Sequence, residues 1–388
     1  MRRSEITMRS RGLAACAFLA VLAACTKTES SKPESTPESN MPERSAPGEQ
    51  PSGGAGAPTA AKKPKIGFVL KTMQEERYKT DRATFESYAA QLGATVLFDS
   101  CNNDEQTQIA KVETMLAQGI DVLVLQPVNH ATASTLVDKA HEKGVKVVSY
   151  DVLVSNADVD WFVTQDSLAV GRLQVAELVK KLGKGKRVFL IKGQPGDSNA
   201  EAFSQGVYDA KERGEIQLLD MKSHEGWAPE RSQQTTEDAF TKFGPDGIDA
   251  FLCNNSGLAW GVLQAVEGRG LGGKVFIAGS DGDLRNVQAI AKGQVAMDVF
   301  KAIKPLASAA ALVAVKLAKG EEISAQVLLG YSDPLSQKAG TKLEITEMSN
   351  GKKKVPTVVT PVYPVTKETI DDTVILDGYH AKDAVYGG

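Results

Sequence analysis

The sequence predicts an α/β fold made of two doubly wound lobes, each with a mostly parallel sheet. From Lys65 onward, short β-branched apolar runs alternate with amphipathic helical patterns, which is typical of repeated βαβ units. The number of runs is too large for one small sheet. The alternation also restarts with a strand at 161–165, which predicts a second sheet.

Two of the apolar runs stop on an aspartate. The run 145–150 is followed by Asp151, and the run 275–280 is followed by Asp281. Ligands of open α/β sheets bind outside the carboxyl ends of the strands. These carboxylates therefore indicate one site built from two halves of the chain, although a strand-end aspartate can also serve only as a helix N-cap.

The expected elements follow from the spacing of apolar residues and from cap residues. The helix 104–118, for example, has Asn103 or Asp104 as its cap, apolar residues on one face, and Gly119 at its end. The expected strands are 65–70, 94–99, 120–126, 145–150, 161–165, 187–192, 216–220, 249–253, 274–279 and 294–300. The expected helices are 75–92, 104–118, 131–143, 167–182, 198–213, 229–242, 257–267, 283–292 and 303–319.

The last part of the chain departs from this alternation. Residues 351–354 read as a solvated turn, and 355–365 as an extended run broken by proline, as a return crossing between lobes requires. Residues 366–379 are expected to form a short helix and a strand.

The N-terminus has the pattern of an export signal. Arginines precede a short apolar run from Leu13 to Ala24, which is too short to span a membrane and ends at Cys25. This end resembles the lipobox of bacterial lipoproteins, so 1–25 is expected to be a signal peptide with Cys25 as the lipidated residue; ordinary signal-peptidase cleavage is the alternative. Translation could start at Met1 or Met8. Residues 26–63, rich in Ser, Pro and Gly, are expected to be a disordered tether.

Composition and motifs exclude several functions. A net charge of -3 offers no basic face for nucleic acid. The Gly-rich segment 268–273 follows a helix and not a strand, so it fails as a dinucleotide fingerprint. The four histidines are scattered, and no nucleophile–base arrangement is present, so neither a metal, a cofactor nor an enzyme is expected. Cys101 and Cys253 are expected to be free buried thiols, although export permits a disulfide.

Read as a whole, the chain resembles the periplasmic sugar-binding proteins of ABC transporters, of the type I or ribose-binding class, with a closer likeness to their xylose-binding members. The likeness covers nearly all of 65–380. It rests on the segments 65–67, 76–82, 92–94, 106–108, 119–124, 158–160, 197–200, 226–227, 264–265, 283–284, 373–375 and 377–380.

The resemblance implies two lobes joined by a three-segment hinge. The N-terminal lobe would comprise 64–166 with about 301–355, and the C-terminal lobe 167–300 with about 360–381. It implies an exported, lipid-anchored, monomeric receptor that closes on a monosaccharide and delivers it to a membrane permease. A sugar sensor for a membrane kinase or chemoreceptor is the alternative. A repressor core of the same fold lacks support, because no helix-turn-helix precedes the first strand.

The resemblance also implies ligand-binding residues, and their chemistry suits a sugar. Carboxylates accept hydrogen bonds from hydroxyls, Arg and Lys donate them, and an aromatic ring covers the C–H face. The implied residues are Arg77, Asp151, Asp166, Asn199, Trp227, Asn255, Asp281 and Lys301. Ordinary alternatives are a cap for Asp166 or Asp197, a core role for Trp227, and a solvated surface position for Arg77 or Lys301. Trp260 could lie near the site, but a core or surface position is favoured.

Three positions depart from the xylose-binding pattern. Val152 replaces an arginine, Ser167 an asparagine, and Ser256 an aspartate. A lost donor in a closed polar pocket leaves hydroxyls unpaired at a cost of roughly 1–3 kcal/mol each. The bound sugar could therefore be xylose, another pentose, a hexose or a polyol.

Overall fold

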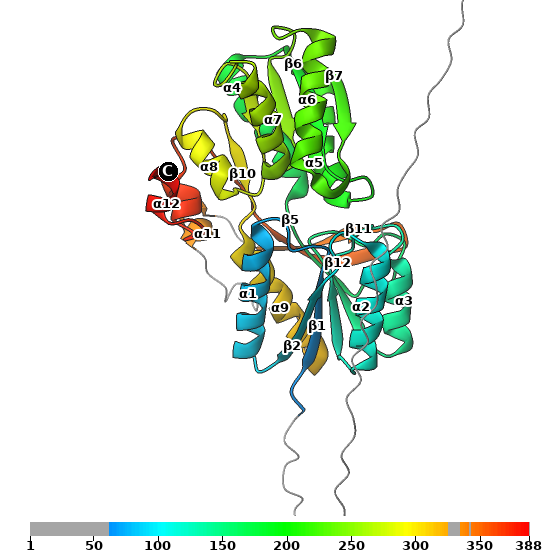
Figure 1. The fold of residues 1–388 in the computed structure, drawn as a ribbon. Coiled ribbons are helices and arrows are strands. Elements are labelled where there is room, and N and C mark those ends of the chain that lie inside the picture. The colour runs from blue at the N-terminus through cyan, green and yellow to red at the C-terminus, as the bar shows by residue number, and fades with distance from the viewer. Residues whose placement is uncertain (1–61, 325–333, 341–342, 388) are drawn as a thin grey trace, which may run out of the picture. The chain divides into compact units, whose positions relative to one another are not determined.

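The computed structural model describes residues 62–324, 334–340 and 343–387. The expected signal peptide, Cys25 and the tether up to residue 61 lie outside the described residues. Within them, the predicted α/β fold with mostly parallel sheets is confirmed (Figure 1).

The first lobe is built on a seven-stranded sheet with the order β11-β12-β5-β4-β3-β1-β2. All its neighbours are parallel except β11 and β12, which are antiparallel. The strands are β1 (Lys65–Leu70), β2 (Thr95–Ser100), β3 (Val122–Leu125), β4 (Lys146–Tyr150), β5 (Trp161–Gln165), β11 (Glu344–Ser349) and β12 (Lys354–Thr360).

Helices cover both faces of this sheet (Figure 1). Alternate residues of β1 point to opposite faces, so that Phe68 packs toward α1 (Arg77–Gln91) and α9 (Ile303–Lys319), whereas Val69 packs toward α2 (Glu105–Ala117) and α3 (Ser134–Glu142). Because both faces are buried, a central strand such as β3 is apolar throughout instead of alternating with polar residues.

The second lobe is built on a parallel four-stranded sheet with the order β7-β6-β8-β9. Its strands are β6 (Lys186–Lys192), β7 (Ile216–Ser223), β8 (Ala250–Cys253) and β9 (Phe276–Ala278). Its helices are α4 (Ser167–Leu182), α5 (Ser198–Glu212), α6 (Pro229–Phe243), α7 (Ser256–Gly268) and α8 (Leu284–Ala291), with the short helical turn η1 (Glu225–Trp227) before α6.

A two-stranded antiparallel ribbon completes the described chain. It pairs β10 (Asp298–Phe300) with β13 (Tyr363–Val365) beside the second sheet. The chain therefore passes between the lobes after β5, after β10 and after β12 within the described residues. Pro361 separates β12 from β13, which is where the extended run was expected to break.

The structure corrects the expected C-terminal elements. Residues 366–379 contain no strand and only a π-helical turn, η2 (Asp371–Ile375), because no sheet edge receives them. The expected strand 294–300 shortens to β10, since only its last residues find a partner strand. Helices α11 (Pro334–Ala339) and α12 (Lys382–Tyr386) were not predicted, because five or six residues carry too little helical periodicity.

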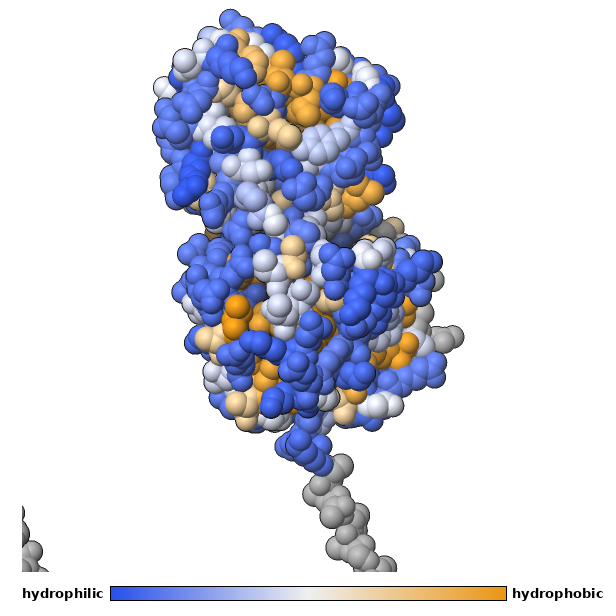
Figure 2. Space-filling view, turned by 90° about the vertical axis from the view of Figure 1, so that its right-hand side faces the viewer, coloured by the Kyte–Doolittle hydropathy of each residue, from blue (hydrophilic) through white to orange (hydrophobic). Residues whose placement is uncertain are grey.

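The surface and the cysteines fit an ordinary folded domain. Figure 2 shows a mostly hydrophilic face, with smaller hydrophobic areas on both lobes. Among the exposed large hydrophobic residues is Met221 of the edge strand β7, which is 49% exposed. Cys101 and Cys253 are free and buried, as expected.

The helices α4 and α5 pack so closely at Gly171 that a larger side chain there should destabilise the protein. A Cβ placed on Gly171 of α4 would lie 2.1 Å from the carbonyl oxygen of Phe203 in α5. We therefore expect Gly171→Ala to push the helices apart and to lower the free energy of unfolding by about 1–3 kcal/mol. Gly268→Ala is the matched control, because nothing lies within 4 Å of its Cβ position. Urea unfolding followed by circular dichroism measures both; equal midpoints would contradict the packing argument.

Candidate functional site

A small cavity lies where the carboxyl ends of strands from the two lobes meet. Its volume is about 20 Å³, which is enough for a single water molecule. A larger ligand therefore requires the surrounding side chains or lobes to move apart. The lining residues are Lys71, Glu75, Arg77, Tyr78, Asp151, Asp197, Asn199, Phe203, Trp227, Asn255, Asp281 and Lys301.

The first lobe contributes an arginine held between two carboxylates. Arg77, at the start of α1, donates from Nε to Asp81 Oδ2 at 3.2 Å, and its Nη1 lies 3.3 Å from Asp151 Oδ2. Asp81 also accepts from the Tyr150 hydroxyl. All four side chains are buried. Burial opposes the charge of Arg77, but Asp151 and Asp81 hold the pKa of its guanidinium well above the usual value.

Asp151 is ionised in this setting. Burial by itself would raise its pKa, but the charges of Arg77, Lys301 and Lys71 outweigh burial and lower the pKa to about 2. Gln126 assists by donating to Asp151 Oδ2 at 2.8 Å. A carboxylate that stays charged at neutral pH is a strong hydrogen-bond acceptor for hydroxyl groups.

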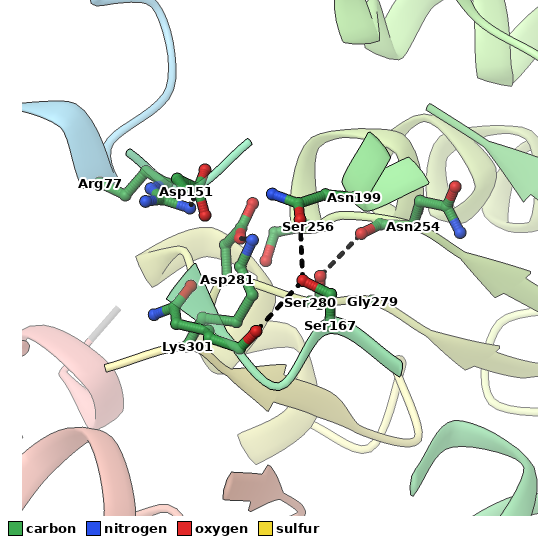
Figure 3. A network of polar contacts seen from close by, with 12 residues as sticks. Arg77, Asp151, Ser167, Asn199, Asn254, Ser256, Gly279, Ser280, Asp281 and Lys301 are labelled. Atoms are coloured by element: carbon green, nitrogen blue, oxygen red, sulfur yellow. Dashed lines mark hydrogen bonds and ion pairs between the residues drawn. The ribbon is translucent and has the colours of Figure 1, made fainter. Parts of the chain in front are cut away.

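A second ion pair joins Asp281 of the second lobe to Lys301, which lies at the crossing back to the first lobe. Lys301 Nζ lies 3.0 Å from Asp281 Oδ1, and both residues are about 95% buried. Asp281 follows β9 in the chain, whereas Lys301 follows β10 at a crossing between the lobes. Figure 3 shows this pair next to Arg77 and Asp151, so that two cations and two carboxylates meet at the cavity.

A buried carboxylate behind Asp281 fixes the loop after β9. Asp298 accepts from Ser256 Oγ and Asn286 Nδ2, both at 2.8 Å, and from the Gly282 backbone N–H at 3.0 Å. Burial raises the pKa of Asp298 to about 7 despite these hydrogen bonds, and the charge of Asp281 adds to the rise. Asp298 positions the ligand-facing loop and does not itself line the cavity.

A third ion pair joins the two lobes directly. Lys71 follows β1, and its Nζ lies 2.5 Å from Oδ2 of Asp197, which caps α5. The same ammonium lies 5.1 Å from the centroid of the Trp227 ring. Both charged groups are almost fully buried where the two lobes meet, so each depends on the other to remain charged there.

Backbone strain is concentrated at the cavity. Asp151 has a φ of 61°, Trp227 of 55° and Asp281 of 104°, all in the region that L-residues avoid. Such conformations cost of order 1–3 kcal/mol each and cluster at ligand sites. The strain turns both strand-end aspartates toward the cavity.

Several polar atoms at the cavity have no hydrogen-bond partner among the described residues. They are Asp151 Oδ1, Glu75 Oε2 and Trp227 Nε1, and each is buried. Buried polar groups are nearly always satisfied in proteins, and an orphan costs about 1–3 kcal/mol. Acceptors and a donor thus face the cavity with unused capacity.

The structure brings together most of the residues singled out in the sequence. The exception is Asp166, which is exposed, caps α4 by accepting from Ala169 N at 3.1 Å, and does not line the cavity. Trp260 is half-buried beside Arg285 and also lies outside the lining. The cavity is lined by Arg77, Asp151, Asn199, Trp227, Asn255, Asp281 and Lys301.

Sequence reasoning missed Lys71, Glu75, Tyr78 and Phe203, and it treated Asp197 only as a cap. Lys71 could have been found, because it follows β1 as Asp151 follows β4. Asp197 does accept from Asn199 N at 2.9 Å, but it also pairs with Lys71. A cap role and a cavity role are compatible in one carboxylate.

The three positions that depart from the xylose-binding pattern lie behind the cavity lining. Val152 is fully buried, Ser167 Oγ donates to Asn199 Oδ1 at 2.8 Å, and Ser256 Oγ donates to Asp298. The two serines therefore orient neighbouring groups instead of facing the cavity themselves.

The part of the chain that the structure describes contains neither a candidate metal centre nor a candidate membrane span. No group of three or more His, Cys, Asp or Glu side chains there could hold a metal ion. None of the helices described has the length and apolar character needed to cross a membrane.

Comparison with known proteins defines the class. The family model of the periplasmic binding protein domain matches residues 66–322, so the chain belongs to this family. Members of the family are binding proteins, and the fold is the type I α/β fold expected from the sequence.

Individual proteins are similar to this one over most of the chain, in sequence or in structure. The D-xylose-binding periplasmic protein of Escherichia coli is 37% identical over 82% of this chain and 92% of its own length. Its counterpart in Haemophilus influenzae is 35% identical over 83% of this chain and 92% of its own length. An ABC-transporter solute-binding protein of Clostridium phytofermentans with bound β-D-glucose superposes with a TM-score of 0.72 at 25% identity, covering 83% of this chain and 99% of that one.

The raised pKa of Asp298 predicts that the stability of the protein depends on pH. Its folded-state pKa of about 7 exceeds its ordinary value of 3.8, so the stability that its neutral form contributes is complete below about pH 4 and is lost as the pH rises through about 7. The Asp298→Asn variant has no carboxyl group to ionise and should not lose this stability. We therefore expect the free energy of unfolding of the variant, relative to that of the natural protein, to rise by up to about 4 kcal/mol between pH 4 and 8.

Urea unfolding at several pH values measures this difference. The amide fits the same site, because Asn286 Oδ1 has no hydrogen-bond partner and a flipped Asn286 could accept from it. Parallel pH profiles for the two proteins would show that Asp298 is not the titrating group.

Proposed function

We propose that this protein is an exported solute-binding receptor that captures a monosaccharide between its lobes and delivers it to an ABC-transporter permease. One observation carries the proposal: Asp151 and Glu75 offer buried, unused acceptor atoms beside the cations Arg77 and Lys301. Sugar hydroxyls supply both donors and acceptors, so they can satisfy both kinds of group at once. The names of the xylose-binding relatives and the glucose-bound neighbour support a sugar.

Six of the lining residues contact the ligand directly in this proposal. Asp151 and Asp281 accept from ring hydroxyls, and Arg77 and Lys301 donate to hydroxyl oxygens. Asn255 Oδ1 is used by the Leu258 backbone N–H at 2.8 Å, which leaves its Nδ2 to donate to the ligand. The apolar face of the sugar would pack on an aromatic ring, for which Trp227 is the candidate.

Closure would proceed about the three crossings between the lobes. We propose a first lobe of 64–166 with about 301–355 and a second of 167–300 with about 360–381. Contacts formed across the cleft stabilise the closed state, including Lys71–Asp197 and the Leu284 N–H donating to Glu76 Oε2 at 2.9 Å. A sugar that touches both lobes adds to these contacts only when they close, and so shifts the population toward the closed form.

The ligand we propose is a neutral pentose or hexose, with xylose as one candidate. Val152 removes a charged donor that the xylose-binding pattern has. The cavity is also lined by the cation Lys71, which is paired with Asp197 and lies 5.1 Å from the centroid of the Trp227 ring. The identity of the sugar therefore depends on which of its hydroxyls the cavity can serve without the donor that Val152 replaces.

Export and anchoring form the second part of the proposal. We propose that residues 1–25 are a signal peptide, that Cys25 carries the lipid, and that 26–63 tether a monomeric receptor to the membrane outside the cytoplasm. The apolar run ending in Leu22-Ala23-Ala24-Cys25 supports this arrangement. The periplasmic relatives agree with export.

A thermal-shift screen with a monosaccharide panel tests binding. A sugar at 100 times its Kd should add about 2.7 kcal/mol to the stability. We expect Asp281→Ala to abolish the shift, because Lys301 loses its partner and the sugar loses an acceptor. Asp166→Ala is the matched control: it should lose about 1 kcal/mol of cap stability and keep the shift. No response to any sugar or polyol would refute the proposal.

Lipid anchoring is tested separately by Cys25→Ser in the full-length chain. We expect the natural protein to partition into the detergent phase of Triton X-114, and the variant to move to the aqueous phase, because an acyl chain contributes about 0.8 kcal/mol per buried CH₂. Cys16→Ser is the control and should stay in the detergent phase. If the Cys25 variant also stays there, Cys25 is not the anchor.

A further inference from the structure

A second hollow opens outward from the cavity and is much larger. Its volume is about 620 Å³, against about 20 Å³ for the inner cavity. The two share Glu75, Trp227 and Asn255 as lining, so they are adjacent and only these side chains stand between them. The lining of this outer groove adds Gln74, Glu76, Lys79, Gly226, Ala228, Pro229, Glu230, Gly257, Asp283, Leu284, Arg285 and Gln288.

The outer groove remains open although the lobes are in contact beside it. Leu284 N–H already donates to Glu76 Oε2, and Lys71 already pairs with Asp197. Its volume falls within the range of about 300–1,000 Å³ that is usual for ligand sites. A group held in the groove is therefore compatible with these contacts between the lobes, whereas the inner cavity has a volume for only a single water molecule.

The groove also carries buried polar groups with unused capacity. Asp283 is only 6% exposed, and its Oδ1 has no hydrogen-bond partner among the described residues. Glu75 Oε2 and Trp227 Nε1, at the junction with the inner cavity, also have no hydrogen-bond partner among the described residues. Burial and the nearby charges of Asp281 and Asp298 raise the pKa of Asp283 well above its usual value, so its carboxyl group is able to donate as well as accept.

The charged residues that line the groove indicate which chemical class of ligand it can bind. Glu75, Glu76, Glu230 and Asp283 face only Lys79 and Arg285 among the charged lining residues. An excess of carboxyl groups disfavours a carboxylate or phosphate on the ligand and is compatible with hydroxyl groups. The occupant that fits is a neutral, hydroxyl-rich group.

We propose that the outer groove is a subsite for a second sugar ring or a small glycosidic substituent, attached to the monosaccharide in the inner cavity. The receptor then accepts small neutral glycosides and disaccharides in addition to free monosaccharides. This inference rests on the proposed sugar-binding function and extends its substrate class.

Calorimetric titration of the full chain tests it with D-xylose, D-glucose, their methyl β-glycosides, xylobiose and cellobiose. We expect at least one disaccharide to bind with a Kd within about tenfold of that of its parent sugar. If a parent sugar binds and none of its derivatives does, the subsite is refuted while the receptor function stands. If none of these compounds binds and the monosaccharide panel also fails, both proposals fall.

A pair of variants at one position locates the binding. A Cβ on Gly257 would have only ordinary contacts, 3.6 Å from Asn255 Oδ1 and from Pro229 Cγ, both of which line the groove. Gly257→Leu should fill the groove and weaken the disaccharide by about tenfold or more, with the parent sugar changed by less than about twofold. Gly257→Ala should leave both affinities unchanged. Equal weakening of parent and disaccharide by the leucine would overturn the assignment to the groove.

Discussion

The structure depends on burying several charged side chains between two sheets without leaving any cation unpaired. Isolated charges cannot be removed from water, because the desolvation cost of each is several kcal/mol. Here Arg77 is paired with Asp81 and Asp151, Lys301 with Asp281, and Lys71 with Asp197. The last pair spans the lobes, so the charges of Lys71 and Asp197 are paired only where the two lobes meet.

Hydrogen bonds behind the cavity hold the strained backbone of Asp151 and Asp281 in place. Both residues have a positive φ. Gln126 donates to Asp151, and Asp298 accepts from Gly282 and Ser256 beside the loop after Asp281. In the proposed receptor, groups held in this way lose less entropy on binding, which favours affinity over maximal stability.

Much of the fold could be predicted because local patterns and tertiary packing agree. The helix 167–182 has the same bounds in the sequence prediction and in the structure, since Asp166 caps it and Gly183 follows it. Prediction was wrong where pairing with a distant strand decides the outcome, as in 294–300 and 366–379. At the site, strand-end position and family resemblance indicated Asp151 and Asp281, but nothing local separated Asp166, a cap, from Asp197, a cap that also lines the cavity.

The sequence by itself determined the two-sheet α/β plan, the strand-end aspartates and the resemblance to sugar-binding proteins, because apolar periodicity and short motifs are properties of neighbouring residues. Only the tertiary structure decided that Lys71 meets Asp197 from 126 positions away, and that Ser167 and Ser256 stand behind the lining. It also revealed the outer groove, whose lining comes from α1, α6, α7 and α8. Such contacts depend on how the two lobes are arranged in space. The spacing of apolar residues along the sequence does not specify that arrangement.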